Sequence, residues 1–283
     1  MTTERWSVKK RKIDLVGIAA YVFLAAFTFL SVFPWFWNLL SSFKSTTDIW
    51  ARPPLFIFDP TLNNYYSAFV TRNFALFLKN TIVVGLSATA LCLVIGVPAA
   101  YAFSRFKTFI GNNQLFFFIL TTRMAPGFVE IIPLYLIFKN IGLLGSPIAL
   151  VFAHVYVNLA FVIWLMKGFF DDITVDLDER AMIDGASRTR AFFQLILPLT
   201  LPGLVTTAIF VLIFSWNEFL FALILTGGLS RTLPVAIPGL VTPAGTYWGE
   251  VMAVATVITV PILIFATAVR KYLVRGLTFG AVK

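Results

Sequence analysis

Long stretches without a charged residue are the feature that most limits what this chain can fold into. No Asp, Glu, Lys or Arg occurs between Asp14 and Lys44, between Lys79 and Arg105, between Lys139 and Lys167, or between Glu250 and Arg270. A bilayer core of about 30 Å needs about 20 helical residues, so each of these four runs is long enough to cross a membrane. Two further apolar stretches, 115–138 and 204–226, are interrupted by Arg123 with Glu130 and by Glu218. We therefore predict six spans.

The composition also indicates a membrane protein. Of the 283 residues, 59% are hydrophobic and only 12% are charged, which leaves too few polar side chains to cover a soluble domain. The apolar runs are continuous and do not alternate, and a backbone in hydrocarbon must satisfy its own hydrogen bonds. The predicted fold class is therefore all-α, a polytopic membrane protein. The first run is too long for a secretory signal, so we interpret it as a retained span.

The positions of Lys and Arg predict the orientation of the spans. With the N-terminus inside, fifteen of the 22 lysines and arginines lie in inner segments and six in outer loops. Positive charge favours the cytoplasmic side, so both termini are expected there. The predicted segments are a basic N-terminus 1–13, a first span 14–40, an external loop 41–79, a second span 80–104, a third 114–138, a fourth 146–166, a cytoplasmic loop 167–201, a fifth span 204–226, an external loop 227–249, a sixth span 250–270 and a cytoplasmic tail 271–283.

The sequence carries no recognisable motif for catalysis or for cofactor binding. The dipeptide Gly-Lys never occurs, which excludes the phosphate-binding P-loop. His154 is the single histidine and Cys92 the single cysteine, so no metal site is expected. Glu130 and Glu218 fall in different spans and cannot be assigned as a catalytic pair. The net charge of +9 is spread over four inner segments, which fits lipid headgroups and not a nucleic-acid surface.

The cytoplasmic loop 167–201 is the most informative segment. Asp176 and Glu179 have the spacing of a capping box, with Asp176 as the N-cap, which predicts a short helix over 177–184. Gly185 suits the left-handed residue that ends such a helix.

A second short helix, over 187–196, is expected to end before Pro198. Its apolar stripe consists of Ala191, Phe192, Leu195 and Ile196. The two helices form a hairpin, for which two roles are open. It could pass a push from a cytoplasmic partner into the membrane, or it could be an interfacial anchor for the loop.

Short motifs in the loop and after it favour one of these two roles. They are Glu179-Arg180-Ala181, Asp184-Gly185-Ala186, Ile196-Leu197-Pro198, Pro202-Gly203, Trp216-Asn217-Glu218-Phe219-Leu220, and the tail Arg275-Gly276-Leu277-Thr278-Phe279-Gly280-Ala281-Val282-Lys283. The loop motifs resemble the EAA loop of permease subunits in ATP-binding-cassette importers, and the others resemble the second permease subunit of maltose-type carbohydrate importers. The resemblance extends from about the second span to the C-terminus. Arg180 departs from it, because the family commonly has an alanine there.

The resemblance implies a non-catalytic subunit of a bacterial inner-membrane importer. Its partners would be a second homologous permease, two ATPase subunits, an external solute-binding protein and membrane lipid, with ATP and Mg bound by the ATPases. The solute would be a sugar, oligosaccharide, polyol or glycerophosphodiester, moved by alternating access. The residues that would dock on an ATPase are Glu179, Ala181, Asp184 and Gly185. Gly280 and Lys283 would approach the ATPase interface, unless the tail is a frayed end.

Two other classes of function compete with this interpretation. An ion-coupled secondary transporter would need an ion site and usually an internal repeat, and we detect neither a convincing repeat nor a carboxylate cluster. A membrane scaffold or sensor without transport is the third possibility.

Ionisable residues within the spans are candidates for a solute path, because they are costly in hydrocarbon. Arg123 and Glu130 are seven residues apart, which would place them on one helix face. Pro126 and Gly127 lie between them, so we expect a kinked or unwound helix there. The alternative is that Arg123 lies nearer the surface and snorkels.

A second candidate group lies in the fifth span. Trp216, Asn217 and Glu218 together are typical of a sugar site, where an aromatic ring stacks on C–H groups and polar atoms bind hydroxyls. The alternative is that Glu218 bonds to a neighbouring helix, for example to Asn158. His154 and Asn158 share one face of the fourth span and are expected to bridge helices or to meet the solute.

Overall fold

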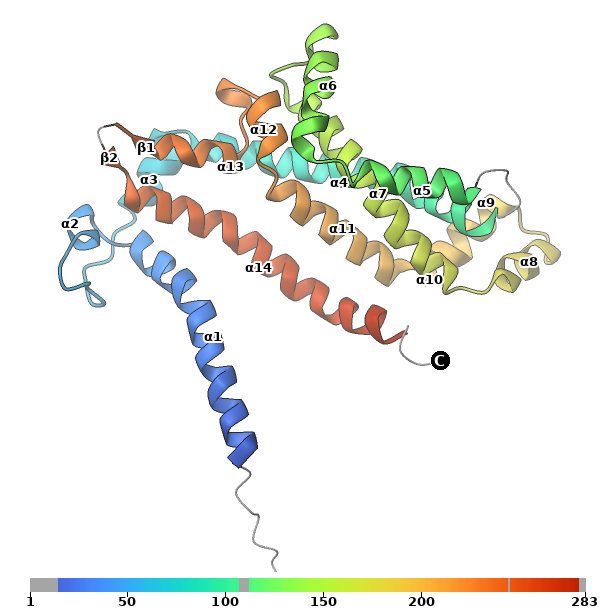
Figure 1. The fold of residues 1–283 in the computed structure, drawn as a ribbon, viewed down its shortest axis with the longest axis horizontal. Helices are drawn as coiled ribbons and strands as arrows, with labels where there is room; N and C mark the ends of the chain where they lie inside the picture. The colour runs from blue at the N-terminus through green and yellow to red at the C-terminus, as the bar shows by residue number, and fades with distance from the viewer. Residues whose placement is uncertain (1–14, 107–111, 244, 280–283) are drawn as a thin grey trace, which may run out of the picture.

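A computed structural model describes residues 15–106, 112–243 and 245–279 (Figure 1). The described chain is almost entirely helical. Its strands are the antiparallel pair β1 (Val241–Thr242) and β2 (Gly245–Thr246). The prediction of an all-α, polytopic membrane protein is confirmed.

Four helices are long and apolar enough to cross a bilayer on their own. They are α1 (Leu15–Ser42), α4 (Phe74–Arg105), α7 (Pro147–Asp171) and α14 (Trp248–Phe279). Two bent pairs raise the number of candidate spans to six if each pair counts as one. The first pair is α5 (Asn112–Thr122) with α6 (Gly127–Asn140), bent by 91°, and the second is the segment Arg188–Leu199 with α11 (Leu201–Trp216), bent by 76°.

Short helices form the connections between the long ones. They are α2 (Thr46–Ile49), α3 (Asn63–Tyr66), the π-helix η1 (Ser67–Thr71), α8 (Val175–Ile183), α9 (Arg188–Ala191), the π-helix η2 (Phe192–Ile196), α10 (Leu197–Leu199), α12 (Leu220–Leu225), η3 (Gly228–Ser230), α13 (Leu233–Ala236) and η4 (Ile237–Leu240). Figure 1 shows α8 at one end of the molecule and α2 with the β1–β2 hairpin at the other.

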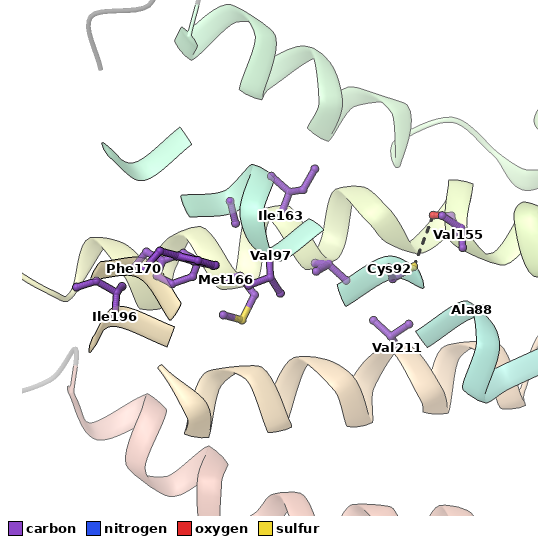
Figure 2. Packing of buried hydrophobic residues seen from close by; sticks show 12 residues of the cluster. Ala88, Cys92, Val97, Val155, Ile163, Met166, Phe170, Ile196 and Val211 are labelled. Carbon is purple, nitrogen blue, oxygen red and sulfur yellow. Dashed lines mark hydrogen bonds between the residues drawn. The ribbon is translucent and has the colours of Figure 1, made fainter. Parts of the chain in front are cut away.

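The core of the bundle is the pair α4 and α7, which share the most extensive helix interface of the described chain and pack against α11. Figure 2 shows the buried side chains of this core, among them Cys92, Val97, Met166, Phe170 and Val211. Cys92 is fully buried, and its Sγ lies 3.8 Å from the carbonyl oxygen of Val155. The cysteine therefore has a packing role, as do the aliphatic residues around it.

Several helices are longer than the predicted spans, because they continue beyond the apolar runs. The second helix begins at Phe74 and not at residue 80, and the fourth continues past 166 to Asp171. An ion pair between Lys167 and Asp171 bridges one turn of this extension. The sixth helix continues to Phe279, so most of the expected tail 271–283 is helical.

The third and fifth spans are not single helices. The third, expected over 114–138, breaks at residues 123–126, where Pro126 and Gly127 predicted a kink. The fifth, expected over 204–226, breaks at 217–219 between α11 and α12. The predicted basic segment 1–13 and the tail residues Gly280 and Lys283 lie outside the described residues.

The close approach of α4 and α7 depends on a glycine. A Cβ atom at Gly96 would lie 2.6 Å from Cγ1 of Val162, well inside van der Waals contact. Val162 is β-branched and fully buried, so its side chain has little freedom to move aside.

We expect Gly96→Val to lower the free energy of unfolding by at least about 2 kcal/mol, because overpacking a tight helix interface strains both helices. The measurement is the thermal midpoint of the detergent-purified protein, which should fall by several degrees. Gly168→Val on α7 is the matched control, since a Cβ there meets nothing within 4 Å. Equal midpoints for the two variants would contradict the packing argument.

Candidate functional site

The predicted hairpin is present at the α8 end of the molecule. Gly185 has φ +90°, the left-handed conformation that favours glycine. The N–H of Gly185 donates to the carbonyl of Met182 at 3.1 Å, and the N–H of Ala186 donates to that of Ala181 at 3.0 Å. These two bonds form a Schellman motif, which ends α8 and reverses the chain.

The start of α8 differs from the predicted capping box. Thr174 is the N-cap and makes no side-chain cap bond, and Asp176 lies inside the first turn with Asp178. Two carboxylates in the first turn still favour the helix, because the N-terminal end of the macrodipole is positive.

The second arm of the hairpin is longer than predicted. Ser187 caps it by accepting the N–H of Arg190 at 3.2 Å, as a serine in this position should. The helical segment then passes through Pro198 and ends at Leu199, whereas we expected it to end earlier. The π-helix η2 shifts the hydrogen-bond register, since Leu197 donates to the carbonyl of Phe192, and the chain accommodates proline after this wider turn.

The hairpin presents a mixed apolar and acidic surface. Glu179, Asp184 and Gly185 are exposed, and Ala181 is half-buried. Ile183 lies among them with 84% of its surface exposed. Sequence reasoning missed Ile183, although its position four residues after Glu179 on a polar helix was a signal. Arg180 is exposed and forms no ion pair within the described chain.

One acidic residue of α8 faces inward. Asp178 is buried, and its Oδ2 atom lies 2.8 Å from Nε of Arg105, the last residue of α4. The two side chains are 8% and 5% exposed. Sequence reasoning did not select this pair, because nothing local links residues 73 positions apart.

The break in the third span forms a small polar cavity. It has a volume of about 230 Å³ and is lined by Thr122, Arg123, Ala125, Gly127, Glu130, Tyr156, Val157 and Phe221. Arg123 and Glu130 therefore share a cavity, although the expectation that they lie on one helix face is wrong, because Arg123 lies in the break and Glu130 in α6.

Contacts of the two charged side chains explain how they are held. Arg123 is exposed, and its guanidinium donates to the carbonyl of Val157 at 2.7 Å. The same guanidinium lies 5.2 Å from the ring centroid of Phe214, within cation–π range. Tyr156 donates a long hydrogen bond of 3.4 Å to Glu130. The cavity thus offers a cation, a carboxylate and a hydroxyl, which can all bind the hydroxyl groups of a solute.

Glu218 has a structural role at the break in the fifth span. Its Oε1 accepts the N–H of Phe221 at 2.8 Å, and its Oε2 accepts that of Ala222 at 2.9 Å. The side chain therefore caps α12. The residue of another helix that Glu218 approaches is His154, whose Nε2 lies 3.4 Å from Oε2 of Glu218. The sequence-based alternative had named Asn158 as this partner.

Asn158 and Trp216 also differ from expectation. Asn158 is buried and donates to the carbonyl of His154 within its own helix, and it is not among the residues lining the cavity. Trp216 is 3% exposed, and its Nε1–H donates to the carbonyl of Ile258 at 3.0 Å. The ring packs edge-on against Phe265 of α14. Trp216 is thus a packing residue between α11 and α14, which overturns its assignment as a stacking platform.

Asn217 is the exposed member of the Trp-Asn-Glu triplet. Its side-chain amide donates to the carbonyl of Ile213 on the preceding turn at 2.8 Å. The backbone N–H of Asn217 donates to the same carbonyl at 3.1 Å. The three residues therefore point to different surroundings and do not form one site.

Two clusters at the end opposite the hairpin were not found from the sequence. Arg72 and Glu250 form an ion pair at 2.6 Å, and Ser67 donates to Glu250 at 2.7 Å. Lys44 is almost fully buried, with its Nζ 4.0 Å from the ring centroid of Trp37. Burial lowers the pKa of the Lys44 ammonium below its ordinary value, although the carboxylate of Asp48 partly offsets this.

The family of the chain follows from residues 92–279, which contain both broken spans and the hairpin. They match the model of the family described as binding-protein-dependent transport system inner membrane component. The chain belongs to this family. It is therefore a permease, a multi-pass membrane subunit of a transport system and not itself an enzyme.

Relatives of the permease match over nearly their whole length. It is 38% identical over 262 residues to a probable ABC transporter permease protein of Sinorhizobium fredii, covering 93% of this chain and 94% of the relative. It is 35% identical over 283 residues to the permease protein of a trehalose/maltose transport system of Thermococcus litoralis, covering 99% of each. It is 34% identical to a diacetylchitobiose uptake system permease protein of Streptomyces coelicolor, covering 89% and 92%.

Solved structures share the fold of the permease. A chain of a bacterial ABC transporter involved in the import of the acidic polysaccharide alginate superposes with a TM-score of 0.80 at 23% identity, covering 93% of this chain and 98% of that one. A second structure, of an alginate ABC transporter in complex with a periplasmic protein bound to an alginate pentasaccharide, gives a TM-score of 0.62 at 15% identity, covering 90% and 94%.

We expect Glu218→Ala to destabilise the permease by about 1–2 kcal/mol, because the amides of Phe221 and Ala222 lose their acceptor. Glu218→Gln retains one side-chain oxygen as an acceptor, so its thermal midpoint should lie between those of Glu218→Ala and the native protein. The measurement is thermal unfolding in detergent. Asn217→Ala is the control, since its side chain bonds only within α11 and its loss should shift the midpoint little. A larger effect of Asn217→Ala than of Glu218→Ala would exclude the capping role.

Proposed function

We propose that this permease is the membrane subunit of an importer for a carbohydrate-like solute, and that the α8–α9 hairpin receives the force of ATP hydrolysis. The observation that carries the proposal is the exposed surface around Glu179, Ile183 and Gly185 on a hairpin that leads directly into spanning helices. The EAA-type residues form this surface. Relatives named for trehalose/maltose and diacetylchitobiose transport support a sugar, an oligosaccharide or a similar polyhydroxylated solute.

The proposed assembly contains a second homologous permease, two ATPase subunits and an external solute-binding protein. ATP and Mg bind to the ATPases, and this chain binds no cofactor. The hairpin faces the cytoplasm of a bacterium whose inner membrane holds the assembly. Glu179 and Asp184 attract basic side chains of an ATPase, while Ile183 fills an apolar depression between them. Any contact of Gly280 and Lys283 with the ATPases belongs to the same proposal.

The proposed mechanism is alternating access. Closure of the ATPase dimer moves the hairpin, and the hairpin moves α11 through the 76° bend before Leu201. Movement of α11 changes the packing of α12 and α6, which border the break that contains Arg123. The path would then open to the opposite side of the membrane.

The small cavity at the broken third span is the proposed contact with the solute. Arg123 and Glu130 lie where a helix is interrupted, and interrupted helices place free polar groups within a membrane in many transporters. Opposite charges beside the Tyr156 hydroxyl suit neutral hydroxyl-rich molecules better than a strongly charged one, because neither charge dominates. The volume of about 230 Å³ fits one sugar ring or a small polyol.

Gly185→Asp tests the coupling role. We expect uptake to fall at least tenfold while membrane insertion is unchanged, because a Cβ at φ +90° strains the turn and a new carboxylate alters the docking surface. Uptake of labelled solute by cells or proteoliposomes is measured with the complete transporter.

Gly142→Asp is the matched control for this variant. Gly142 also has a positive φ, of +72°, with nothing within 4 Å of a Cβ, but it lies in the connection between α6 and α7. It should retain most of the uptake. Normal uptake by Gly185→Asp would count against the proposal, as would uptake that survives ATP depletion and stops with an uncoupler, the behaviour of an ion-coupled transporter.

The cavity is tested with Glu130→Gln, for which we expect the KM of uptake to rise severalfold with little change in the maximal rate. The carboxylate would lose its charge-assisted hydrogen bonds to solute hydroxyls. The solute is first identified from ligand that co-purifies with the binding protein. Glu179→Gln is the contrasting variant and should lower the maximal rate with an unchanged KM. An unchanged KM in Glu130→Gln would remove the cavity from the solute path.

A further inference from the structure

The buried ion pair between Arg105 and Asp178 connects the hairpin to a helix that is distant from it in sequence. The hairpin continues directly from α7 through residues 172–174 and leads directly into α11. By contrast, α4 ends at Arg105, and more than sixty residues separate it from α8. Because no chain segment joins them directly, α4 can follow a movement of α8 only through side-chain contacts.

The guanidinium of Arg105 also contacts the end of α7 and the connection that follows it. Its NH1 group donates to the carbonyl of Phe170 at 3.0 Å, and its NH2 group donates to that of Ile173 at 3.1 Å. Phe170 lies in the last turn of α7, and Ile173 lies in the connection between α7 and α8. The planar, multidentate guanidinium therefore fixes α4, the end of α7 and the start of α8 in one geometry.

Asp178 is held from a second side by Tyr101. The hydroxyl of Tyr101, one turn before Arg105 on α4, donates to Oδ1 of Asp178. The Tyr101 ring also lies 4.7 Å from that of Phe192 in the second arm of the hairpin and 5.5 Å from that of Phe170. Both arms of the hairpin thus meet α4 at the same place.

The neighbours of Asp178 show that its burial is specific. Asp176 and Glu179 lie on the same helix and are exposed, whereas Asp178 is 5% exposed. A buried carboxylate is tolerated only with a partner that supplies charge and hydrogen bonds. Arg105 and Tyr101 of α4 supply these partners, so the position of α8 against α4 is fixed by specific polar contacts.

We infer that Arg105 and Asp178 are positioning residues that make α4 move together with the coupling hairpin. This inference rests on the proposed coupling function. It adds a route that does not run along the chain: displacement of α8 pulls on Arg105, and α4 carries the movement into the α4–α7 core. The pair acts on the conversion of ATP hydrolysis into transport and not on the docking of the ATPases.

The test measures solute transported per ATP hydrolysed, in proteoliposomes that contain the complete transporter and its binding protein. We expect Asp178→Asn to lower this ratio at least fivefold while ATP hydrolysis stays above half of the native rate. Asp176→Asn, two residues away and exposed, is the matched control and should leave the ratio unchanged. A structural defect that reduces the number of active complexes would lower both rates equally and leave the ratio unaltered.

A double-substitution series gives an independent readout. Arg105→Gln combined with Asp178→Asn should be no worse than either single variant, because both remove the same interaction. Arg105→Lys keeps the charge but loses the planar guanidinium that bonds the carbonyls of Phe170 and Ile173. Its ratio of solute transported to ATP hydrolysed should therefore lie between those of the native protein and Arg105→Gln. A native ratio in Asp178→Asn, or fully additive losses, would overturn the inference. Loss of assembly in both Asp178→Asn and Arg105→Lys would assign the pair to folding and would also overturn it.

Gly185→Asp in the same assay separates this inference from the proposed function. If Gly185→Asp abolishes transport while Asp178→Asn transports with the native ratio, only the inference fails. If Gly185→Asp also transports normally, the coupling function itself fails.

Discussion

The need to satisfy backbone polar groups in apolar surroundings governs this structure. Within a continuous helix the requirement is met locally, so α1, α4, α7 and α14 need nothing but length and apolar side chains. At two of the helix ends, a charged side chain bonds the backbone. Glu218 accepts the first amides of α12, and Arg105 donates to the carbonyls of Phe170, in the last turn of α7, and of Ile173, just after it. These two charges, one inside an apolar run and one at the border of another, thus lie where helices stop.

The features with proposed functions also lie at helix ends. The hairpin follows the end of α7, and the small cavity with Arg123 and Glu130 occupies the break in the third span. The cluster of Arg72 and Glu250 lies beside the start of α14, at the far end of the molecule from α8 in Figure 1. Continuous helices transmit movement as rigid bodies, so changes between two states of such a bundle concentrate at the junctions between them.

Much of this arrangement could be predicted from the sequence where one residue type has one local physical consequence. Uncharged length predicted the spans, and Pro126 with Gly127 predicted the break in the third. Gly185 predicted a left-handed turn because a side chain is strained at positive φ. The assignment of Trp216 to a sugar site was wrong for the opposite reason. Its position in the chain does not reveal that its indole N–H bonds to Ile258 on α14.

The sequence by itself determined the all-α membrane class, the number of candidate spans and the hairpin with its exposed EAA-type residues, because each follows from local composition or local backbone preference. Only the tertiary structure decided which charged residues meet. Arg105 pairs with Asp178, and Glu218 approaches His154, although each pair is separated by more than sixty positions. Such pairings depend on how helices pack, and packing is fixed by the sum of many side-chain contacts that no short stretch of sequence contains.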